Sequence, residues 1–279
     1  MGVERSGSKI VKFYVPLAFY LIFLLFPFYW MFITTFKSDQ ELYNLKLNPF
    51  WIHSPTLSHV VELFTQTIFL RWMANTFFVA ITATAISLVA SLMAAYAIQR
   101  LRFKTSGPTG VAIFLGYLIP QTILFIPLAT IIFKFGLWDS LWALVLTYPT
   151  FLIPFCTWLL MGYFKSIPKE MEECAMIDGA SRVKIFRKII LPLCLPGVLS
   201  AGIFCFTLSW NEYLYALSFI SSTAKKTVPI GLVTELVRGD VYHWGALMAG
   251  ALCASVPVAL VYSFFVESYV AGMTGALKE

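Results

Sequence analysis

The sequence carries little charge. Only 12% of its 279 residues are charged and 59% are hydrophobic, whereas a soluble domain carries about 25% charged residues. The net charge of +6 comes without a basic stripe interleaved with aromatic side chains, which argues against nucleic acid as a partner. The low share of charged residues and the high share of hydrophobic residues indicate that lipid solvates most of the chain. Because hydrocarbon offers backbone groups no hydrogen-bond partner, the expected fold class is an all-α polytopic membrane protein.

Residues typical of catalytic and metal sites are scarce or scattered. The five cysteines form no Cys-x-x-Cys pair, and the three histidines (His53, His59 and His243) fall in loop-like segments, too scattered for a metal site, so we expect neither disulfides nor metal ligands. No glycine directly precedes a lysine, which excludes the Gly-x-x-x-x-Gly-Lys-Ser/Thr loop that cradles ATP phosphates. The sequence also lacks a Ser/His/Asp set, a His-Glu-x-x-His helix and paired catalytic carboxylates. We therefore expect no catalytic residue and no cofactor on this chain.

Six apolar segments are long enough to cross a bilayer, which takes about 20 residues. The first has the basic start of a signal peptide, but its apolar run is too long and lacks a small-x-small cleavage site, so we expect a retained helix. Prolines such as Pro120 and Pro127 within the spans either favour kinks or reflect the frequency of proline in membrane helices. We expect a single transmembrane domain over residues 1–279, with spans at 13–36, 73–98, 109–133, 141–163, 197–220 and 244–268.

The distribution of Lys and Arg predicts the orientation. With the N-terminus in the cytoplasm, 13 of the 20 Lys and Arg residues fall inside, and the opposite topology inverts that bias. We therefore expect both termini inside. This topology leaves residues 37–72 and 221–243 outside and places the polar segment 164–196 in the cytoplasm, between the fourth and fifth spans.

The segment 164–196 has the pattern of two short helices joined at a bend. Ser166 and Pro168 can start the first helix, Gly179 can end it in a left-handed conformation, and Ser181 can cap the second. An amphipathic loop lying on anionic headgroups would show a similar pattern, but the small residues at the bend also permit close approach of another surface. The second helix is expected to have one apolar face formed by Val183, Phe186 and Ile190.

The spacing within this segment resembles the EAA loop of permease subunits in bacterial ATP-binding cassette (ABC) importers. That loop reads Glu-Ala-Ala-x-x-x-Gly-Ala, and Cys174 here replaces the first Ala. The stretches NTFFVAITATAISLVASLMAAYAIQRLRF (75–103), SWNEYLYAL (209–217) and GMTGALKE (272–279) resemble the shorter permease partner of maltose-type carbohydrate importers, so the resemblance covers nearly the whole chain. The residues that match the EAA loop are Glu173, Ala175, Asp178, Gly179, Ala180, Phe186, Leu191, Pro192 and Pro196.

The resemblance implies a permease subunit in the bacterial inner (plasma) membrane, in an ATP-driven, binding-protein-dependent importer that moves a sugar or sugar-like solute by alternating access. In that family the loop is a coupling helix seated in a groove of a cytoplasmic ATPase, and the C-terminal tail (272–279 here) reaches the ATPase interface. Glu279 stands where the family often has Gly. The implied partners are a second related permease, two copies of the ATPase (which bind ATP and Mg), an extracytoplasmic solute-binding protein and the lipid bilayer. The implied ATPase-docking residues are Glu173, Ala175, Asp178, Gly179, Ala180, Ser181 and Phe186.

Polar residues in the fifth predicted span are candidates for the substrate pathway. Carboxylate, amide and aromatic groups suit sugar recognition, but the same residues would serve as contacts between helices or to the binding protein, and Trp210 as an interfacial anchor. Asn75 is expected to make a cap or an interhelical hydrogen bond. Two alternative functions stay open: an ion-coupled secondary transporter of small polar solutes, although no internal repeat is visible, and a structural or sensory membrane subunit. The pathway candidates are Trp210, Asn211, Glu212 and Tyr213.

Overall fold

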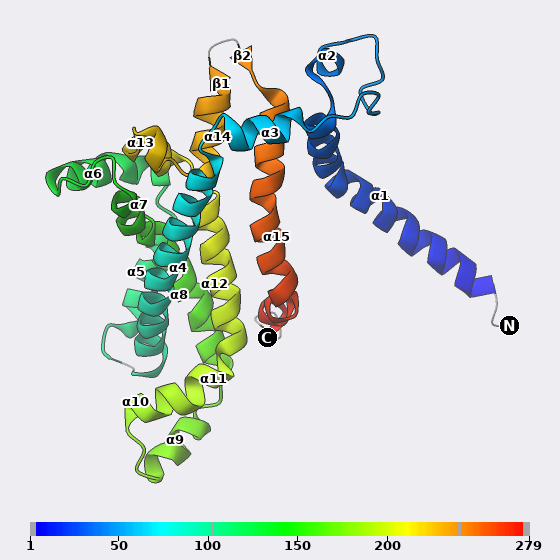
Figure 1. Ribbon diagram of the computed structural model, residues 1–279. Coiled ribbons are helices and arrows are strands. Elements are labelled where there is room, and N and C mark those ends of the chain that lie inside the picture. Colours follow the sequence, from blue (N-terminus) through cyan, green and yellow to red (C-terminus); the bar gives the residue numbers. More distant parts are fainter. Residues whose placement is uncertain (1–3, 102, 239–240, 276–279) are drawn as a thin grey trace. The chain divides into compact units, whose positions relative to one another are not determined.

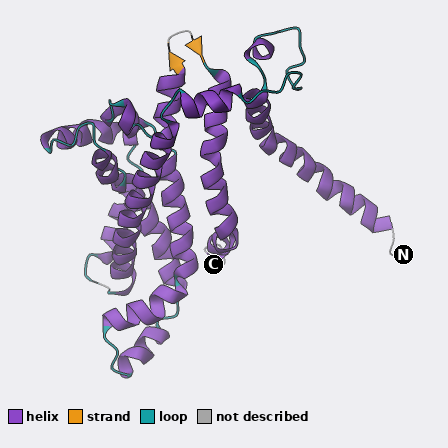
Figure 2. Ribbon diagram, viewed as in Figure 1, coloured by secondary structure: helices purple, strands orange, loops and turns teal. Residues whose placement is uncertain are grey.

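The computed structural model describes residues 4–101, 103–238 and 241–275. Helices make up nearly all of the regular structure (Figures 1 and 2), as the composition predicts. Two short strands, β1 (Val237–Arg238) and β2 (Val241–Tyr242), pair antiparallel. The helices are α1 (Glu4–Phe36), α2 (Asp39–Leu42), α3 (Ser58–Thr65), α4 (Phe69–Arg100), α5 (Ser106–Tyr117), α6 (Gln121–Lys134), α7 (Leu141–Thr147), α8 (Pro149–Ser166), α9 (Glu170–Ile177), α10 (Arg182–Ile185), the π-helical turn η1 (Phe186–Ile190), α11 (Leu191–Leu193), α12 (Leu195–Trp210), α13 (Leu214–Phe219), the 3₁₀ turn η2 (Thr223–Lys225), α14 (Val228–Leu236) and α15 (Trp244–Gly275).

Four segments of the described chain are helical, long and apolar enough to cross a membrane. They are Val11–Phe36, Phe69–Arg100, Leu141–Ser166 and Trp244–Val266. Two further pairs of helices qualify only when each pair is taken together, because each pair bends sharply at a short break. The structure therefore has four to six candidate spans, in the same order along the chain as the six predicted ones.

The third predicted span, 109–133, is not one straight helix. Its two halves, α5 and α6, meet at an angle of 94°. Pro120 lies at the break and has no N–H to donate, and a proline also disfavours helical backbone in the residue before it. Pro127 and Pro154, in contrast, lie inside helices α6 and α8. The proline at a helix boundary thus breaks the span, and those within helices do not.

The fifth predicted span, 197–220, is also interrupted. Helix α12 ends at Trp210 and α13 begins at Leu214. No proline or glycine lies in the break, and polar side chains take up the backbone groups that it frees, as described below. A bend of 75° before α12 separates it from the short helices α10 to α11.

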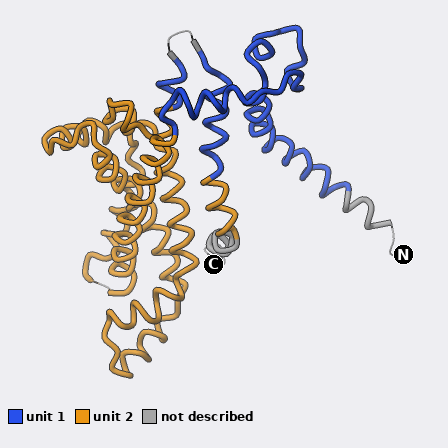
Figure 3. The backbone as a smooth tube through the Cα atoms, viewed as in Figure 1, with its two compact units in different colours: residues 1–69, 232–256 blue, residues 70–231, 257–279 orange. Residues whose placement is uncertain are grey.

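The chain divides into two compact units (Figure 3): unit 1 comprises 1–69 and 232–256, and unit 2 comprises 70–231 and 257–279. Helix α8 is central to the core of unit 2. Its residues Leu152, Cys156, Leu160 and Phe164 follow one another at intervals of four and are all fully buried. Helix α12 packs closely on α8 at Gly197, where a Cβ atom would lie 2.4 Å from the Tyr163 ring. The four buried residues of α8 form the apolar stripe with which this helix faces the core.

Unit 1 is organised around a buried histidine. His59 lies in α3, with its Nε2 2.9 Å from the carbonyl oxygen of Lys37, and only 3% of its surface is exposed. Gly245 allows the first turn of α15 to press on the imidazole, because a Cβ atom there would lie 2.2 Å from the ring. The prediction that all three histidines fall in loops is therefore wrong for His59, which has a packing role.

Candidate functional site

The polar segment 164–196 forms the predicted helix–bend–helix at one end of unit 2 (Figure 1). Helix α9 ends at Ile177, and Gly179 follows in a left-handed conformation with φ of +78°. The N–H of Gly179 donates to Met176 O (3.0 Å), and that of Ala180 donates to Ala175 O (2.9 Å). This pair of hydrogen bonds is the Schellman motif, which satisfies the last carbonyl groups of a helix. The predicted role of Gly179 in ending the helix is confirmed.

The second helix begins as predicted but turns differently. The hydroxyl of Ser181 accepts the N–H of Lys184 (3.4 Å) and so caps α10. The helix then widens into the π-turn η1, in which residues five apart share a face. Ile185 and Ile190 are consequently the buried pair, and Val183 is 67% exposed. The predicted apolar face is therefore wrong for Val183, whereas Ile190 is buried and Phe186 packs against the core.

The predicted docking residues divide between an exposed and an inward set. Ala175 is 9% exposed, and the half-buried Phe186 packs against the core of unit 2. Sequence reasoning missed the apolar tip of α9, where Ile177 is 85% exposed and Met176 43% exposed. The only signal for these two was their place beside the bend. We use the name docking surface for the exposed group Glu173, Met176, Ile177, Asp178, Gly179 and Ser181.

A buried ion pair, also not predicted, holds α9 against the rest of unit 2. Arg100, at the end of α4, has its Nε 3.0 Å from Oε1 of Glu172, and the two side chains are 3% and 11% exposed. The approach is close, although the N–H does not point at the oxygen as in a hydrogen bond. The Nη2 of Arg100 donates to the carbonyl oxygens of Phe164 (2.5 Å) and Ile167 (2.6 Å). One guanidinium thus connects α4, the end of α8 and α9.

The four pathway candidates do not share one surface. Asn211 and Tyr213 are exposed, whereas Trp210 (3% exposed) and Glu212 (7% exposed) are buried. Trp210 packs on Phe77 with ring centroids 4.8 Å apart, a contact inside unit 2. The four are consecutive in the sequence, but their side chains divide between the surface and the core.

Asn211 and Glu212 explain why the fifth span is interrupted. The Nδ2 of Asn211 donates to Thr207 O (2.9 Å) at the end of α12. The carboxylate of Glu212 accepts the N–H groups of Tyr215 (2.7 Å) and Ala216 (3.1 Å) at the start of α13. Helix ends leave such groups unsatisfied, and polar side chains compete for them. The carboxylate of Glu212 is thereby engaged by the backbone of its own chain.

Asp139 joins two loops of unit 2, the one between α6 and α7 and the one between α13 and α14. Its carboxylate accepts the N–H groups of Ser221 and Ser222 (both 2.9 Å) and lies 3.1 Å from the Nζ of Lys225. Burial alone raises the pKa of Asp139, but the Ser222 hydroxyl, the two N–H groups and Lys225 outweigh it and hold the pKa well below its ordinary value. Nearby, Asn75 donates to Ala224 O and Lys226 O (3.0 and 2.9 Å). This confirms the prediction that Asn75 has a structural role.

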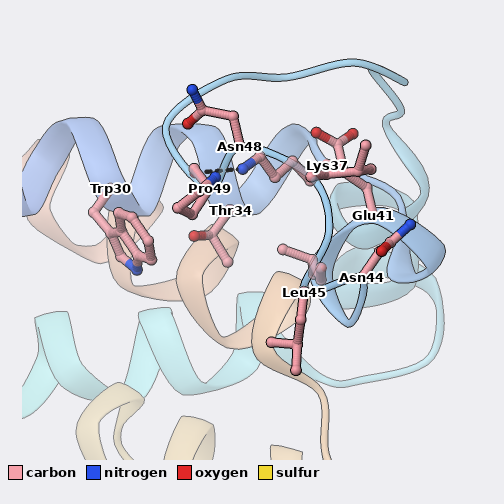
Figure 4. A pocket seen from close by; sticks show the side chains of 10 residues that line it. Trp30, Thr34, Lys37, Glu41, Asn44, Leu45, Asn48 and Pro49 are labelled. Atoms are coloured by element: carbon pink, nitrogen blue, oxygen red, sulfur yellow. Dashed lines mark hydrogen bonds between the residues drawn. The ribbon is translucent and has the colours of Figure 1, made fainter.

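Unit 1 contains a small pocket of about 170 Å³ at the end of α1 (Figure 4). Trp30 and Asn48 line it together with two charged side chains, which suggests a ligand site by composition. The charged groups are already engaged, however. Lys37 Nζ donates to Pro49 O (2.5 Å), and the Glu41 carboxylate accepts two backbone N–H groups from residues 53 and 54. Small-molecule sites usually measure roughly 300–1,000 Å³, so this pocket is too small for a typical solute. Its charged side chains instead stabilise the loop after α1.

No cluster of metal-binding side chains occurs in the described parts of the chain. The predicted tail contact lies largely outside the described residues, because 276–279 are not described and the side chains of 272–275 are not either. The loop of α9 and α10 therefore remains the best-defined candidate site.

Residues 86–274 match the family model of the binding-protein-dependent transport system inner membrane component. The chain belongs to this family. The sulfoquinovosyl glycerol transport system permease protein SmoH of Agrobacterium fabrum is 37% identical over 91% of this chain and 89% of its own. The trehalose/maltose transport system permease protein MalG of Thermococcus litoralis is 34% identical over 92% of each chain.

A solved structure has the same fold. It is the crystal structure of a bacterial ABC transporter involved in the import of the acidic polysaccharide alginate, with a TM-score of 0.81, 20% identity, and coverage of 96% of this chain and 99% of the other. Membership in the family makes this chain a multi-pass inner membrane permease subunit of an ABC importer. ATP hydrolysis is carried out by a separate chain, so the alternatives of an ion-coupled transporter and a purely structural or sensory subunit no longer stand.

Proposed function

We propose that this permease subunit imports a sugar or sugar-like solute and that its α9–α10 loop is the coupling element that docks on a cytoplasmic ATPase. The cargo class is supported by relatives whose names specify sulfoquinovosyl glycerol and trehalose or maltose. In this proposal both termini and the loop 164–196 face the cytoplasm, in agreement with the Lys and Arg bias. The chain pairs with a second permease, two ATPase subunits that bind ATP and Mg, and an extracytoplasmic binding protein.

The observation that carries the docking role is the exposed apolar tip of α9. Ile177 and Met176 place an exposed apolar contact at the tip of α9 beside charged side chains, and covering that contact with a partner surface is favourable. Glu173 lies one turn before Ile177 on the same face of the helix and adds a charge beside the apolar contact. Closure of the ATPase subunits would move α9, and Arg100 links α9 to the end of α4. A movement of the loop thus has a rigid connection to a membrane-spanning helix.

A reconstituted complex tests both parts of the proposal. The permease pair, the ATPase and the binding protein are purified together and placed in liposomes, and ATP-dependent uptake of radiolabelled maltose, trehalose and a control amino acid is measured. We expect uptake of a carbohydrate only, with insensitivity to a proton uncoupler. Uptake of the amino acid alone would refute the cargo class without affecting the docking role.

The docking role has its own variants. Ile177→Asp removes the apolar tip of α9. A central apolar contact of this kind contributes about 2 kcal/mol or more to binding, so the affinity of the permease for the ATPase should fall about 30-fold or more. Met171→Asp makes the same change in charge at the other end of α9, where Met171 is also exposed (42%), and serves as the matched control. Gly179→Arg should abolish uptake while the protein is still inserted. If Ile177→Asp and the native chain bind the ATPase with equal affinity, this surface is not the docking site.

A further inference from the structure

An apolar groove runs along unit 2 beside the loop, apart from the docking surface. It measures about 670 Å³ and lies between the last turns of α4 and the segment α10–η1–α11. This volume is within the range of roughly 300–1,000 Å³ typical of small-molecule sites. Tyr96 and Phe186 form part of its lining and pack on each other, with ring centroids 4.8 Å apart. Met93 (64% exposed) and Val183 (67% exposed) leave much of the remaining wall uncovered.

Two arginines also line the groove. Arg182 and Arg187 lie on the loop side, both are exposed, and neither forms an ion pair within the part of the chain that the structure describes. Guanidinium groups bind phosphate oxygens in bidentate fashion. Lys184 and Lys188, on the same short stretch, do not line the groove. The groove thus combines an apolar lining with two side chains that can bind an anion.

The position of the groove limits its occupant. Its α4 wall is the end of a membrane-spanning helix, Phe69–Arg100, and its other wall belongs to a polar loop, so it lies where hydrocarbon gives way to water. At that depth the abundant molecule with an acyl chain on one side and a phosphate on the other is a phospholipid. Basic pockets beside membrane helices bind anionic headgroups in this way.

We propose that this groove is a binding site for one anionic phospholipid, with an acyl chain along Met93, Tyr96 and Val183 and the headgroup phosphate on Arg182 and Arg187. The bound lipid covers the apolar wall that the chain leaves exposed. The site depends neither on the identity of the cargo nor on the orientation of the chain, because both leaflets contain phospholipid. Failure of the proposed function would therefore leave it standing.

Native mass spectrometry of the intact detergent-purified complex tests the site. The complex is incubated with phosphatidylglycerol or phosphatidylethanolamine, and bound lipids are counted for the native chain, R182Q/R187Q and K184Q/K188Q. Juxtamembrane basic residues each contribute about fivefold to the affinity for anionic lipid. We expect one tightly held phosphatidylglycerol, a loss of affinity of roughly 25-fold in R182Q/R187Q, and little change in K184Q/K188Q, which loses the same charge.

A second variant tests the apolar half of the groove. Ala97 lines it, so Ala97→Trp fills the groove and should displace the lipid while both arginines remain, and excess inorganic phosphate should fail to displace it from the native complex. Equal loss in the two double variants would overturn the proposal, because it would show only a diffuse attraction to basic residues. Cross-linking of Val183→Cys to another protein chain in the assembled complex would also overturn it, because a protein partner would then cover the groove.

Discussion

Removal of the buried guanidinium at the end of α4 should destabilise the permease strongly. Arg100→Met keeps most of the volume but leaves the carboxylate of Glu172 buried without its partner. It also leaves the carbonyl oxygens of Phe164 and Ile167 without their donor. Breaking a buried ion pair by removing one partner costs about 3–5 kcal/mol. At roughly 2–4 °C per kcal/mol for a chain of this size, the midpoint of thermal unfolding should fall by about 6–20 °C.

The double variant separates this ion pair from a general loss of packing. Replacing both partners of a buried pair by apolar side chains is often neutral. R100M/E172M should therefore be more stable than R100M alone, with a coupling free energy of about 1–3 kcal/mol. Thermal unfolding of the purified complex in detergent, followed by intrinsic fluorescence, measures R100M, E172M and the double variant.

Lys104→Met is the matched control for this experiment. Lys104 is exposed and lies four residues beyond Arg100, so its loss should change stability by no more than about 0.5 kcal/mol. If the destabilisation in R100M/E172M equals the sum of the two single variants within about 0.5 kcal/mol, the two side chains do not interact. The proposed connection between α4 and α9 would then be refuted.

Three further substitutions test the local geometry. Gly179→Ala should lower stability by about 1–2 kcal/mol, because the left-handed backbone disfavours a side chain even though the space around it is open; an unchanged unfolding midpoint would contradict this. Asp139→Asn should cost about 1.5–3 kcal/mol in charged hydrogen bonds. The pKa of Asp139 is lowered on folding, so its contribution is present above the unfolded pKa of about 3.9 and is lost as the pH falls through the folded pKa. Below pH 4 the unfolding midpoint of the native chain should therefore fall more steeply than that of Asp139→Asn. Glu212→Gln should destabilise by about 1–3 kcal/mol with an unchanged KM for uptake, whereas a change in KM alone would return this residue to the substrate pathway.

The sequence was sufficient for the features that depend on local chemistry. An apolar run of more than about 20 residues implies a spanning helix, and each of the six predicted segments is helical over most of its length. Gly179 and Ser181 were assigned correctly because capping depends on one residue and its immediate neighbours. The resemblance to the EAA loop then supplied a function for this geometry.

Features that depend on distant residues were not predictable in the same way. Arg100 and Glu172 are 72 positions apart, and a single sequence carries no signal for their pairing. Hydrophobicity gives the length of a span but not whether it is straight: a kink at Pro120 was one of two interpretations of that proline, and the break after Trp210 had no such signal. At the second break, Asn211 and Glu212 were candidates either for the substrate pathway or for contacts between helices, and polarity alone could not foresee that they hydrogen-bond to the helix ends.

The two neighbouring glutamates of α9 show how the docking helix serves both the fold and its proposed partner. Adjacent residues of a helix point about 100° apart. Glu172 therefore lies on the inward face with Ala175, three positions on, and both are buried. Glu173 lies on the outward face with Ile177, four positions on, and both are exposed. The inward face is held by Arg100, so an ATPase that moves the outward face must move the end of α4 as well.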